Sequence, residues 1–528
     1  MRPRALRRSS PGRRRRNNIS VPYGANVAVV EPHGIERIDE SERHGSPRDL
    51  FSLWFAANAE TATFATGILT VALFGTSFWG AVLGIVIGNL AGYAVLGFLA
   101  QMGPRFGRPQ MMVSRQTLGT DANVFPALLA FLAGVGWFAI DTIFGAFAVQ
   151  ALLGLAHVSI SYVPALAIVL AIEIVIVIYG YNMIHLFEKV AGVALTVGFI
   201  AIAVVCFQQA NPNAPFDVHA PLASGGELAG IVFSAAIAFS YAIGWAPCAA
   251  DYSRYLPRNA DKRAIWWWTF LGGGVPSTAL EILGAAAVTA IVGTDLVAAT
   301  PSDIIQKLFA SNWLVALGLL TVLLGTLSAN CLNLYSGSLA SLVAWDGRRR
   351  AWFAIFVGAA FTCGTVVMLA VAGQTDPAAR FAPTVIAGCA LGVGFVTGLV
   401  VRYTLVRWQA ALLVGILGGL LSLAGLYPAQ VAREYTSFLL LLSSWATPWA
   451  GAVIAARGMP SDQRVSATLL GWLVGLAVAL PFYQQAWFVG PVAVRFPQIG
   501  DISYFVGFAV AYAVTRVLTM QARPREAH

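Results

Sequence analysis

The chain has 528 residues, of which 58% are hydrophobic and only 11% are charged. A soluble domain carries about 25% charged residues, so this composition excludes a soluble globular protein and predicts an all-α polytopic protein in a lipid bilayer. The formal net charge of +9 then reflects the orientation of the loops, and we expect no nucleic-acid partner.

Residues 1–48 carry 11 arginines and few bulky apolar residues, which predicts a basic, largely disordered cytoplasmic tail. Residues 49–520 form the predicted transmembrane domain, and residues 521–528 a second cytoplasmic tail. Runs of about 20 apolar residues are long enough to cross a bilayer. We place fourteen of them at 50–74, 78–101, 124–155, 160–181, 187–208, 227–249, 265–293, 308–344, 351–373, 382–401, 408–427, 434–456, 467–488 and 500–518.

Basic residues are distributed unevenly between the two sets of loops. The loops on the side of the N-terminal tail, together with the C-terminal tail, hold 18 basic residues. The opposite loops hold only Lys307, Arg380, Arg433 and Arg495. Because cytoplasmic loops carry the excess of Lys and Arg, this predicts a multi-pass protein of the cytoplasmic (plasma) membrane with both termini in the cytoplasm.

The first and sixth runs are irregular at membrane depth. The first carries Asn58, Glu60 and Thr61 where a lipid-facing helix would carry leucine, and the sixth is interrupted by Gly244 and Pro247. A break is tolerated in lipid only where the freed N–H and C=O groups meet protein, water or a ligand, and such breaks mark the binding sites of secondary transporters. Each of the two runs opens a group of five, which is typical of a five-plus-five inverted repeat.

The third and eighth runs offer groups suited to a flat heterocyclic ligand. Trp137 and Asp141 are four residues apart and therefore share a helical face, and Asn330 and Asn333 are three apart. A planar ring needs an aromatic face, which Trp137 and Trp245 could supply, and amide groups that offer donor and acceptor together. The alternative for the tryptophans is anchoring at the membrane interface.

Among the ionisable groups inside predicted runs, the candidates for a function are Glu60, Asp141, Glu173 and Glu281. Such groups are costly in a membrane and by default face the bundle interior. For Glu60 and Asp141 a functional role and a packing role are both open, whereas Glu173 and Glu281 have little polar company in the sequence and are expected to serve packing.

The sequence shows no pattern of catalytic chemistry. The five cysteines and six histidines are scattered without C-x-x-C spacing, so we expect no disulfide framework and no clustered metal site. Because no nucleophile constellation or phosphate-binding loop is present either, the protein is not expected to be an enzyme, and no cofactor is predicted.

Several motifs, in order along the chain, resemble those of the nucleobase-cation-symport-1 family, in particular its purine/cytosine permease branch. They are Gly34–Ile38, Leu50–Asn58, the Gly136–Trp137 pair, Gly244–Pro247, Asp251–Tyr255, Asn333–Ser336 and Ser444–Trp449.

The resemblance implies a LeuT-like fold with alternating access and a substrate held between the first, third, sixth and eighth spans. It implies stacking on Trp137, with Asp141 one turn further along and Asn330 or Asn333 bound to the edge of the ring. The sixth span is expected to be unwound over Ser240, Tyr241, Gly244 and Trp245, offering backbone groups to the substrate. Asp251–Tyr255 lies at the predicted cytoplasmic end of the sixth span. These residues could gate the site or cap the helix, but we favour the simpler interpretation that their charges only mark the cytoplasmic side of the membrane.

In sodium-coupled relatives, backbone carbonyls of the first span and groups of the eighth hold the cation. The corresponding positions here are Asn58, Thr61, Gly325, Ser328 and Ala329. Since Ala329 lacks the second hydroxyl, a Na⁺ site would be weakened, and proton coupling through Glu60 or Asp141 is an open alternative.

The sequence thus predicts a symporter that imports cytosine, a purine or a related planar nitrogen heterocycle with Na⁺ or H⁺. A carrier of another small amine or an amino acid on the same fold is the main alternative, and a membrane sensor or channel is a third. Family members usually have twelve spans, so the expected number is 12 to 14, with the extra pair between residues 351 and 427. The oligomeric state is not predicted.

Overall fold

The computed structural model describes residues 23–27, 29–291, 299–345, 405–457, 461–485 and 488–521. Eleven helices in these ranges are long and apolar enough to cross a membrane. They contain α3 (Phe78–Ala100), α6 (Val124–Leu155), α7 (Tyr162–Tyr179), α8 (Tyr181–Gln209), α9 (Gly226–Gly244), α10 (Lys262–Ala290), α12 (Asn312–Trp345), α15 (Arg407–Leu421), α16 (Pro428–Ala455), α17 (Ser461–Ala479) and α19 (Ser503–Gln521).

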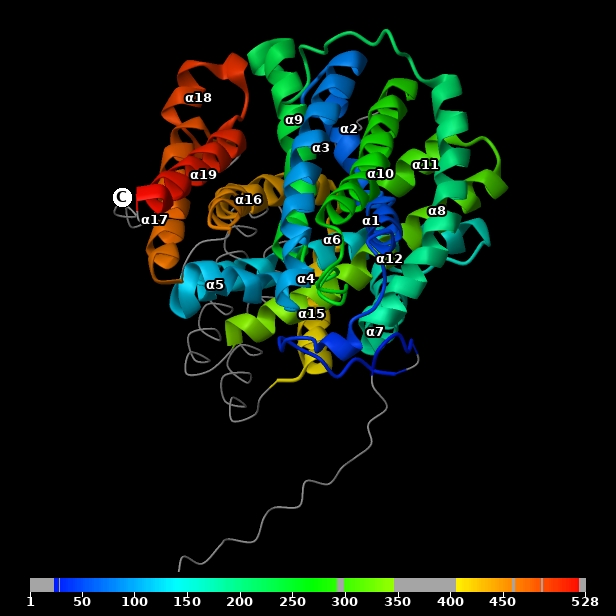
Figure 1. Cartoon of the computed structure of the whole chain (residues 1–528). Coiled ribbons are helices and arrows are strands. Elements are labelled where there is room, and N and C mark those ends of the chain that lie inside the picture. The colour runs from blue at the N-terminus through cyan, green and yellow to red at the C-terminus, as the bar shows by residue number, and fades with distance from the viewer. Residues whose placement is uncertain are drawn as a thin grey trace, which may run out of the picture.

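Shorter elements complete the bundle in Figure 1. These are α1 (Asp49–Asn58), α2 (Thr61–Ala72), α4 (Met102–Phe106), α5 (Gln110–Ala122), α11 (Pro301–Leu308), α18 (Pro491–Arg495) and a hairpin of β1 (Gln484–Gln485) and β2 (Phe488–Val489). With α1 and α2 counted as one broken span, twelve of the fourteen predicted runs coincide with helices. The runs predicted at 351–373 and 382–401 lie outside the described residues.

The first span is broken, as predicted. Helix α1 ends at Asn58 and α2 begins at Thr61, and Glu60 between them has an extended backbone with φ −141° and ψ 175°. Its carboxylate accepts hydrogen bonds from the N–H groups of Ala62 (2.6 Å) and Thr63 (3.2 Å). Because the first N–H groups of a helix have no partner within it, Glu60 acts as the N-cap of α2 and stabilises the break.

The break in the sixth span begins later than predicted. Helix α9 continues to Gly244 and is followed by Trp245 and a single 3₁₀ turn, Ala246–Cys248. Ser240 and Tyr241 are therefore helical, and the expectation that they lie in an unwound stretch is wrong. The small and apolar residues before Gly244 sustain the helix, whereas Pro247 lacks an N–H and restricts the residue before it, so the helix stops immediately upstream.

Close contacts through glycine fix the helix pairs around the two breaks. A Cβ added at Gly67 would overlap the carbonyl oxygen of Glu281, and one at Gly284 would overlap that of Phe64, so α2 and α10 touch backbone to backbone. Gly134 of α6 lies against Gly337 of α12, where an added Cβ would be 2.9 Å from Cα. These contacts hold α6 and α12 beside the broken first span.

Candidate functional site

An aromatic cluster surrounds Trp137 on α6. The Trp137 ring makes edge-to-face contacts with Tyr241 of α9 (5.5 Å between centroids) and with Tyr435 (6.1 Å) and Phe438 (5.3 Å) of α16. A Cβ added at Gly244 would lie 3.1 Å from Trp137 Nε1, so glycine at the end of α9 permits the approach of the indole. Trp137 is buried within the bundle.

Asp141 and the two asparagines of α12 lie one turn from this cluster. Asn333 Nδ2 donates to Asp141 Oδ2 (3.1 Å) and to Asn330 Oδ1 (3.1 Å). Asp141 Oδ1 is buried and has no hydrogen-bond partner among the described residues. Since a buried carboxylate oxygen is costly without a partner, this atom is a natural acceptor for a ligand or a water molecule.

Asn330 makes different hydrogen bonds from Asn333. Its Nδ2 donates to Glu173 Oε1 (2.6 Å), Thr142 Oγ1 (3.0 Å) and the carbonyl of Phe138 (3.1 Å). Glu173 therefore has polar partners that the linear sequence did not indicate. Because these contacts occupy the donors of the Asn330 amide, the structure places Asn333 with Asp141, and Asn330 in a network between α6, α7 and α12.

Tyr241 connects α9 to the break in the first span. Its hydroxyl donates to Glu60 Oε1 (2.6 Å), and Thr63 Oγ1 lies 2.6 Å from the same hydroxyl. Further along α2, Thr66 Oγ1 lies 2.7 Å from the Tyr435 hydroxyl. The two tyrosines thus join the aromatic cluster to the polar groups of α2.

Two other predicted substrate residues lie at the borders of this cluster. Ser240 Oγ accepts a hydrogen bond from Ser443 of α16 (2.5 Å). Trp245 Nε1 donates to Asn58 Oδ1 (3.0 Å), and its ring meets Trp54 edge to face at 5.6 Å. Trp245 is therefore packed on α1.

The residues predicted to hold the coupling cation each contact different partners in the structure. Asn58 accepts from the Tyr93 hydroxyl (2.6 Å) as well as from Trp245, and its side chain points to α3 and α9. Thr61 Oγ1 donates to the carbonyl of Val322 (3.0 Å), and a Cβ at Gly325 would lie 2.9 Å from Glu60 Cα. Ser328 Oγ donates to Glu188 Oε2 of α8 (2.5 Å).

The site also contains residues that the sequence analysis did not single out. Tyr435 and Phe438 are three apart on α16, a spacing shared by many packing residues and therefore uninformative on its own. Glu188 was not singled out because it stands at the very start of the predicted run 187–208, beside Lys189, which marks a predicted cytoplasmic loop. Helix α8 begins at Tyr181, so Glu188 is in fact inside it.

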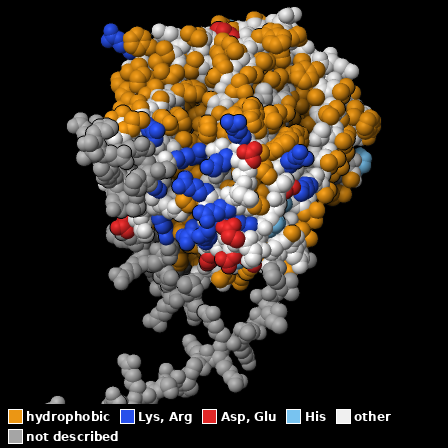
Figure 2. Space-filling model, in the orientation of Figure 1, with side chains coloured by type: hydrophobic (Ala, Val, Ile, Leu, Met, Phe, Trp, Pro, Cys, Tyr) orange, Lys and Arg blue, Asp and Glu red, His pale blue; other side chains and the backbone are white. Residues whose placement is uncertain are grey.

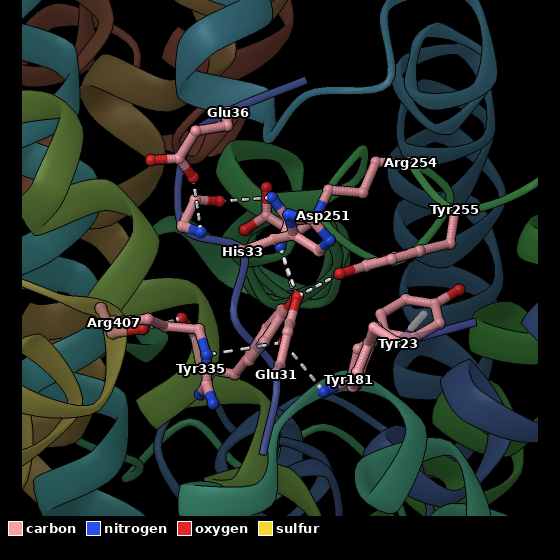
Figure 3. Close-up of polar contacts among 12 residues, drawn as sticks. Tyr23, Glu31, His33, Glu36, Tyr181, Asp251, Arg254, Tyr255, Tyr335 and Arg407 are labelled. Carbon is pink, nitrogen blue, oxygen red and sulfur yellow. Dashed lines mark hydrogen bonds and ion pairs between the residues drawn. The ribbon is translucent and has the colours of Figure 1, made fainter. Parts of the chain in front are cut away.

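A second polar network lies at the end of the bundle where the N-terminal segment runs (Figure 3). Glu31 is fully buried and accepts from Arg254 Nη2 (2.7 Å), the Tyr255 hydroxyl (2.6 Å) and the Tyr335 hydroxyl (3.0 Å), while Arg407 Nε lies 3.5 Å from its other oxygen. Burial, and then the Glu31 carboxylate, raise the pKa of Tyr255, which keeps the phenol protonated as a donor. The network joins the segment before α1 to the α9–α10 loop, α12 and α15.

Two discontinuous helices that meet at an aromatic and polar cluster inside a membrane bundle define a secondary transporter. The comparisons with known proteins agree with this class. The model of the family described as permeases for cytosine/purines, uracil, thiamine and allantoin matches residues 37–375, and the chain belongs to this family. This confirms the resemblance to the nucleobase-cation-symport-1 family and the prediction that the protein is not an enzyme.

Related proteins cover nearly the whole chain. YxlA of Bacillus subtilis (strain 168), provisionally named a purine-cytosine permease, is 26% identical over 93% of this chain and 96% of its own length. The purine-cytosine permease fcyB of Emericella nidulans is 27% identical over 91% and 87%. The structure of Mhp1, a nucleobase-cation-symport-1 family transporter with bromovinylhydantoin bound, covers 93% of this chain and 95% of its own, with 19% identity and a TM-score of 0.63. It confirms the LeuT-like fold.

Proposed function

We propose that this chain is a symporter of the plasma membrane, with both termini cytoplasmic, that imports cytosine, a purine base or a related planar nitrogen heterocycle. Coupling to Na⁺ or H⁺ drives the import. The names of YxlA and fcyB support this substrate class. The observation that carries the proposal is the buried, unpartnered Oδ1 of Asp141, one helical turn from Trp137.

The chemistry of these two groups fits an aminated base. An indole face attracts a flat aromatic ring. The exocyclic amine of cytosine or adenine is a hydrogen-bond donor, which suits a carboxylate oxygen that only accepts. Asn333 holds the other oxygen of Asp141 at 3.1 Å and so fixes the direction of the free one. A base without an amine at that edge would leave Asp141 Oδ1 unpaired and would bind less well.

Ligand-induced thermal stabilisation of the purified full chain tests this proposal. A ligand at a hundredfold excess over its dissociation constant stabilises the protein by about 2.7 kcal/mol. We expect cytosine or adenine to raise the melting temperature, uracil to do so less, and amino acids not at all. Asp141→Asn should weaken the preference for the aminated bases, because an amide supplies a donor as well as an acceptor. Stabilisation by an amino acid but by no base would overturn the proposed substrate class.

A further inference from the structure

Three arginines lie together where α4, α16 and α17 meet, and we call them the arginine cluster. They are Arg105 of α4, Arg457 just after the end of α16, and Arg464 in the first turn of α17. Arg457 Nη1 donates to Gln101 Oε1 (3.1 Å), and Gln101 stands one helical turn before Arg105. Arg105 is close enough to both of the other arginines for their like charges to repel. The cluster is therefore electrostatically unfavourable on its own.

Several buried N–H groups of the arginine cluster have no acceptor. Arg457 Nε and Nη2 and Arg464 Nε are buried and make no hydrogen bond among the described residues. Burial, and then the charge of Arg105, lower the pKa of Arg457 to about 10, as expected for a cation without a counter-anion, and the group stays charged at neutral pH. Because buried polar groups are normally paired, these donors indicate a site for an anionic ligand.

The carboxylates near the cluster are engaged elsewhere. Helices α3, α4 and α19 contain no Asp or Glu. Asp121, at the end of α5, already has a partner, and Asp261 caps α10 by accepting from the N–H of Arg263 (2.9 Å). In the part of the chain that the structure describes, none of the three arginines forms an ion pair with a carboxylate. A bound anion would supply the missing charge.

An aromatic group beside the cluster indicates its depth in the membrane. The Arg457 guanidinium lies over the Phe98 ring at 5.8 Å, and the centroids of the Phe98 and Trp266 rings are 5.8 Å apart. Phe98 is 43% exposed and the adjoining Trp267 is 53% exposed, so the cluster borders the outer apolar surface of the bundle. Tryptophans concentrate at the level of the lipid headgroups. This setting puts the arginine cluster at the depth of lipid phosphates.

We propose that the arginine cluster binds the phosphate group of an anionic phospholipid. A guanidinium presents its N–H donors as a fork that matches two phosphate oxygens, so one headgroup satisfies the buried donors of Arg457 and Arg464. Basic pockets between transmembrane helices bind such headgroups on the cytoplasmic side. Free phosphate shares this chemistry, but the exposed Phe98 and Trp267 favour a ligand with acyl chains. The bound lipid joins α4 to α16 and α17 and stabilises the bundle, and it takes no part in substrate binding at Trp137.

Native mass spectrometry and melting temperatures of the delipidated full chain in a neutral detergent test this site. The probes are phosphatidylglycerol, phosphatidylcholine and inorganic phosphate. We expect phosphatidylglycerol to bind and to raise the melting temperature, and the other two probes to do neither. Arg457→Gln should weaken the binding of phosphatidylglycerol by roughly tenfold, because a charge-assisted hydrogen bond is lost.

A second variant and a matched control separate lipid binding from folding. Arg105→Gln should also weaken the binding of phosphatidylglycerol, and it should keep the fold because Arg105 is exposed. Arg495→Gln is the control, because Arg495 is an exposed arginine of α18 whose guanidinium likewise lies over a phenylalanine ring, that of Phe496 at 5.8 Å. This variant should bind phosphatidylglycerol as tightly as wild type does.

Four outcomes would overturn the inference. They are equal binding of phosphatidylcholine, stabilisation by inorganic phosphate that phosphatidylglycerol does not exceed, undiminished binding by both Arg105→Gln and Arg457→Gln, and an equal loss in Arg495→Gln. The first would show hydrophobic association alone, and the second would show a site for a free anion. None of these measurements requires transport, so a failure here leaves the proposed function standing.

Discussion

At the scale of single residues, Trp137 supplies the aromatic face on which the proposed substrate stacks. Replacement by alanine removes the stacking face and loosens the cluster with Tyr241 and Phe438. We expect Trp137→Ala to reduce uptake of labelled base at least tenfold at normal membrane expression, and Trp137→Phe to retain part of it. Trp313→Ala is the matched control, because Trp313 is 67% exposed on α12, and its uptake should equal that of wild type.

Asn330 and Asn333 differ in what they hold, although their spacing made them equivalent in the sequence. Asn330→Ala removes the donor to Glu173 Oε1 at 2.6 Å and should destabilise the protein by about 1 to 3 kcal/mol. Asn333→Ala should lower the affinity for base with a smaller loss of stability. Melting temperatures with and without cytosine separate the two effects, and equal losses of stability would contradict the assignment.

The limits of sequence analysis are visible in the same residues. Trp137, Asp141 and Asn333 could be found because aromatic, acidic and amide groups are rare at membrane depth. Glu188 stands at the start of the predicted run 187–208 beside the basic Lys189, which indicates the end of a span, whereas α8 begins at Tyr181 and places Glu188 well inside the helix. The aromatic contribution of α16 depends on how that helix packs against α6, which local sequence does not encode.

At the scale of elements, contact between α2 and α10 depends on glycine. A Cβ at Gly67 would overlap the backbone of Glu281, so we expect Gly67→Ala to force the helices apart and lower the melting temperature. In Gly154→Ala, the control near the end of α6, the new methyl meets nothing within 4 Å. That change should be neutral or stabilise by about 0.5 to 1 kcal/mol, because glycine is unfavourable inside a helix.

The structure of the N-terminal segment was the hardest to predict from composition. Its arginines predicted a largely disordered tail, yet Tyr23, Glu31 and Ile38 are buried in the structure. Composition describes the average of a segment, whereas this contact depends on one carboxylate that meets Arg254 and Arg407 from distant parts of the chain. The long spans, by comparison, were predictable from hydrophobic length, and the two breaks from the polar residues of the first span and from Gly244 and Pro247 of the sixth, because these features act locally.

Glu31→Gln tests the contribution of that contact. Breaking a buried ion pair by removing one partner costs on the order of 3 to 5 kcal/mol, because the remaining charge stays buried. We expect a clear fall in melting temperature and faster proteolysis of the segment before α1. Asp39→Asn, at an exposed position of the same segment whose side chain caps no helix, should leave both measurements unchanged. A similar result for the two variants would show that the Glu31 network contributes little to the stability of the fold.

At the scale of the whole molecule, charge and apolar surface are segregated. Figure 2 shows hydrophobic side chains over most of the upper part of the visible face, while most Lys and Arg side chains gather lower down, on the side of the N-terminal segment. A bilayer would cover the apolar zone, and the basic zone would face the cytoplasm. The Glu31 network lies at this basic end and the Trp137 cluster lies deeper in the bundle, so the proposed import path runs toward the network.

Labelling of introduced cysteines from one side of the membrane tests this orientation. The exposed Asn213 lies before α9 and the exposed Asn259 lies after it, so they stand at opposite ends of the sixth span. In a background in which the five native cysteines are replaced, a membrane-impermeant thiol reagent should label Asn213→Cys in intact cells. Asn259→Cys should react only after permeabilisation, because it shares a loop with the basic residues Arg258 and Lys262. The reverse pattern would place the basic face outside and overturn the proposed direction of import, whereas labelling of both sites in intact cells would contradict a membrane crossing by α9.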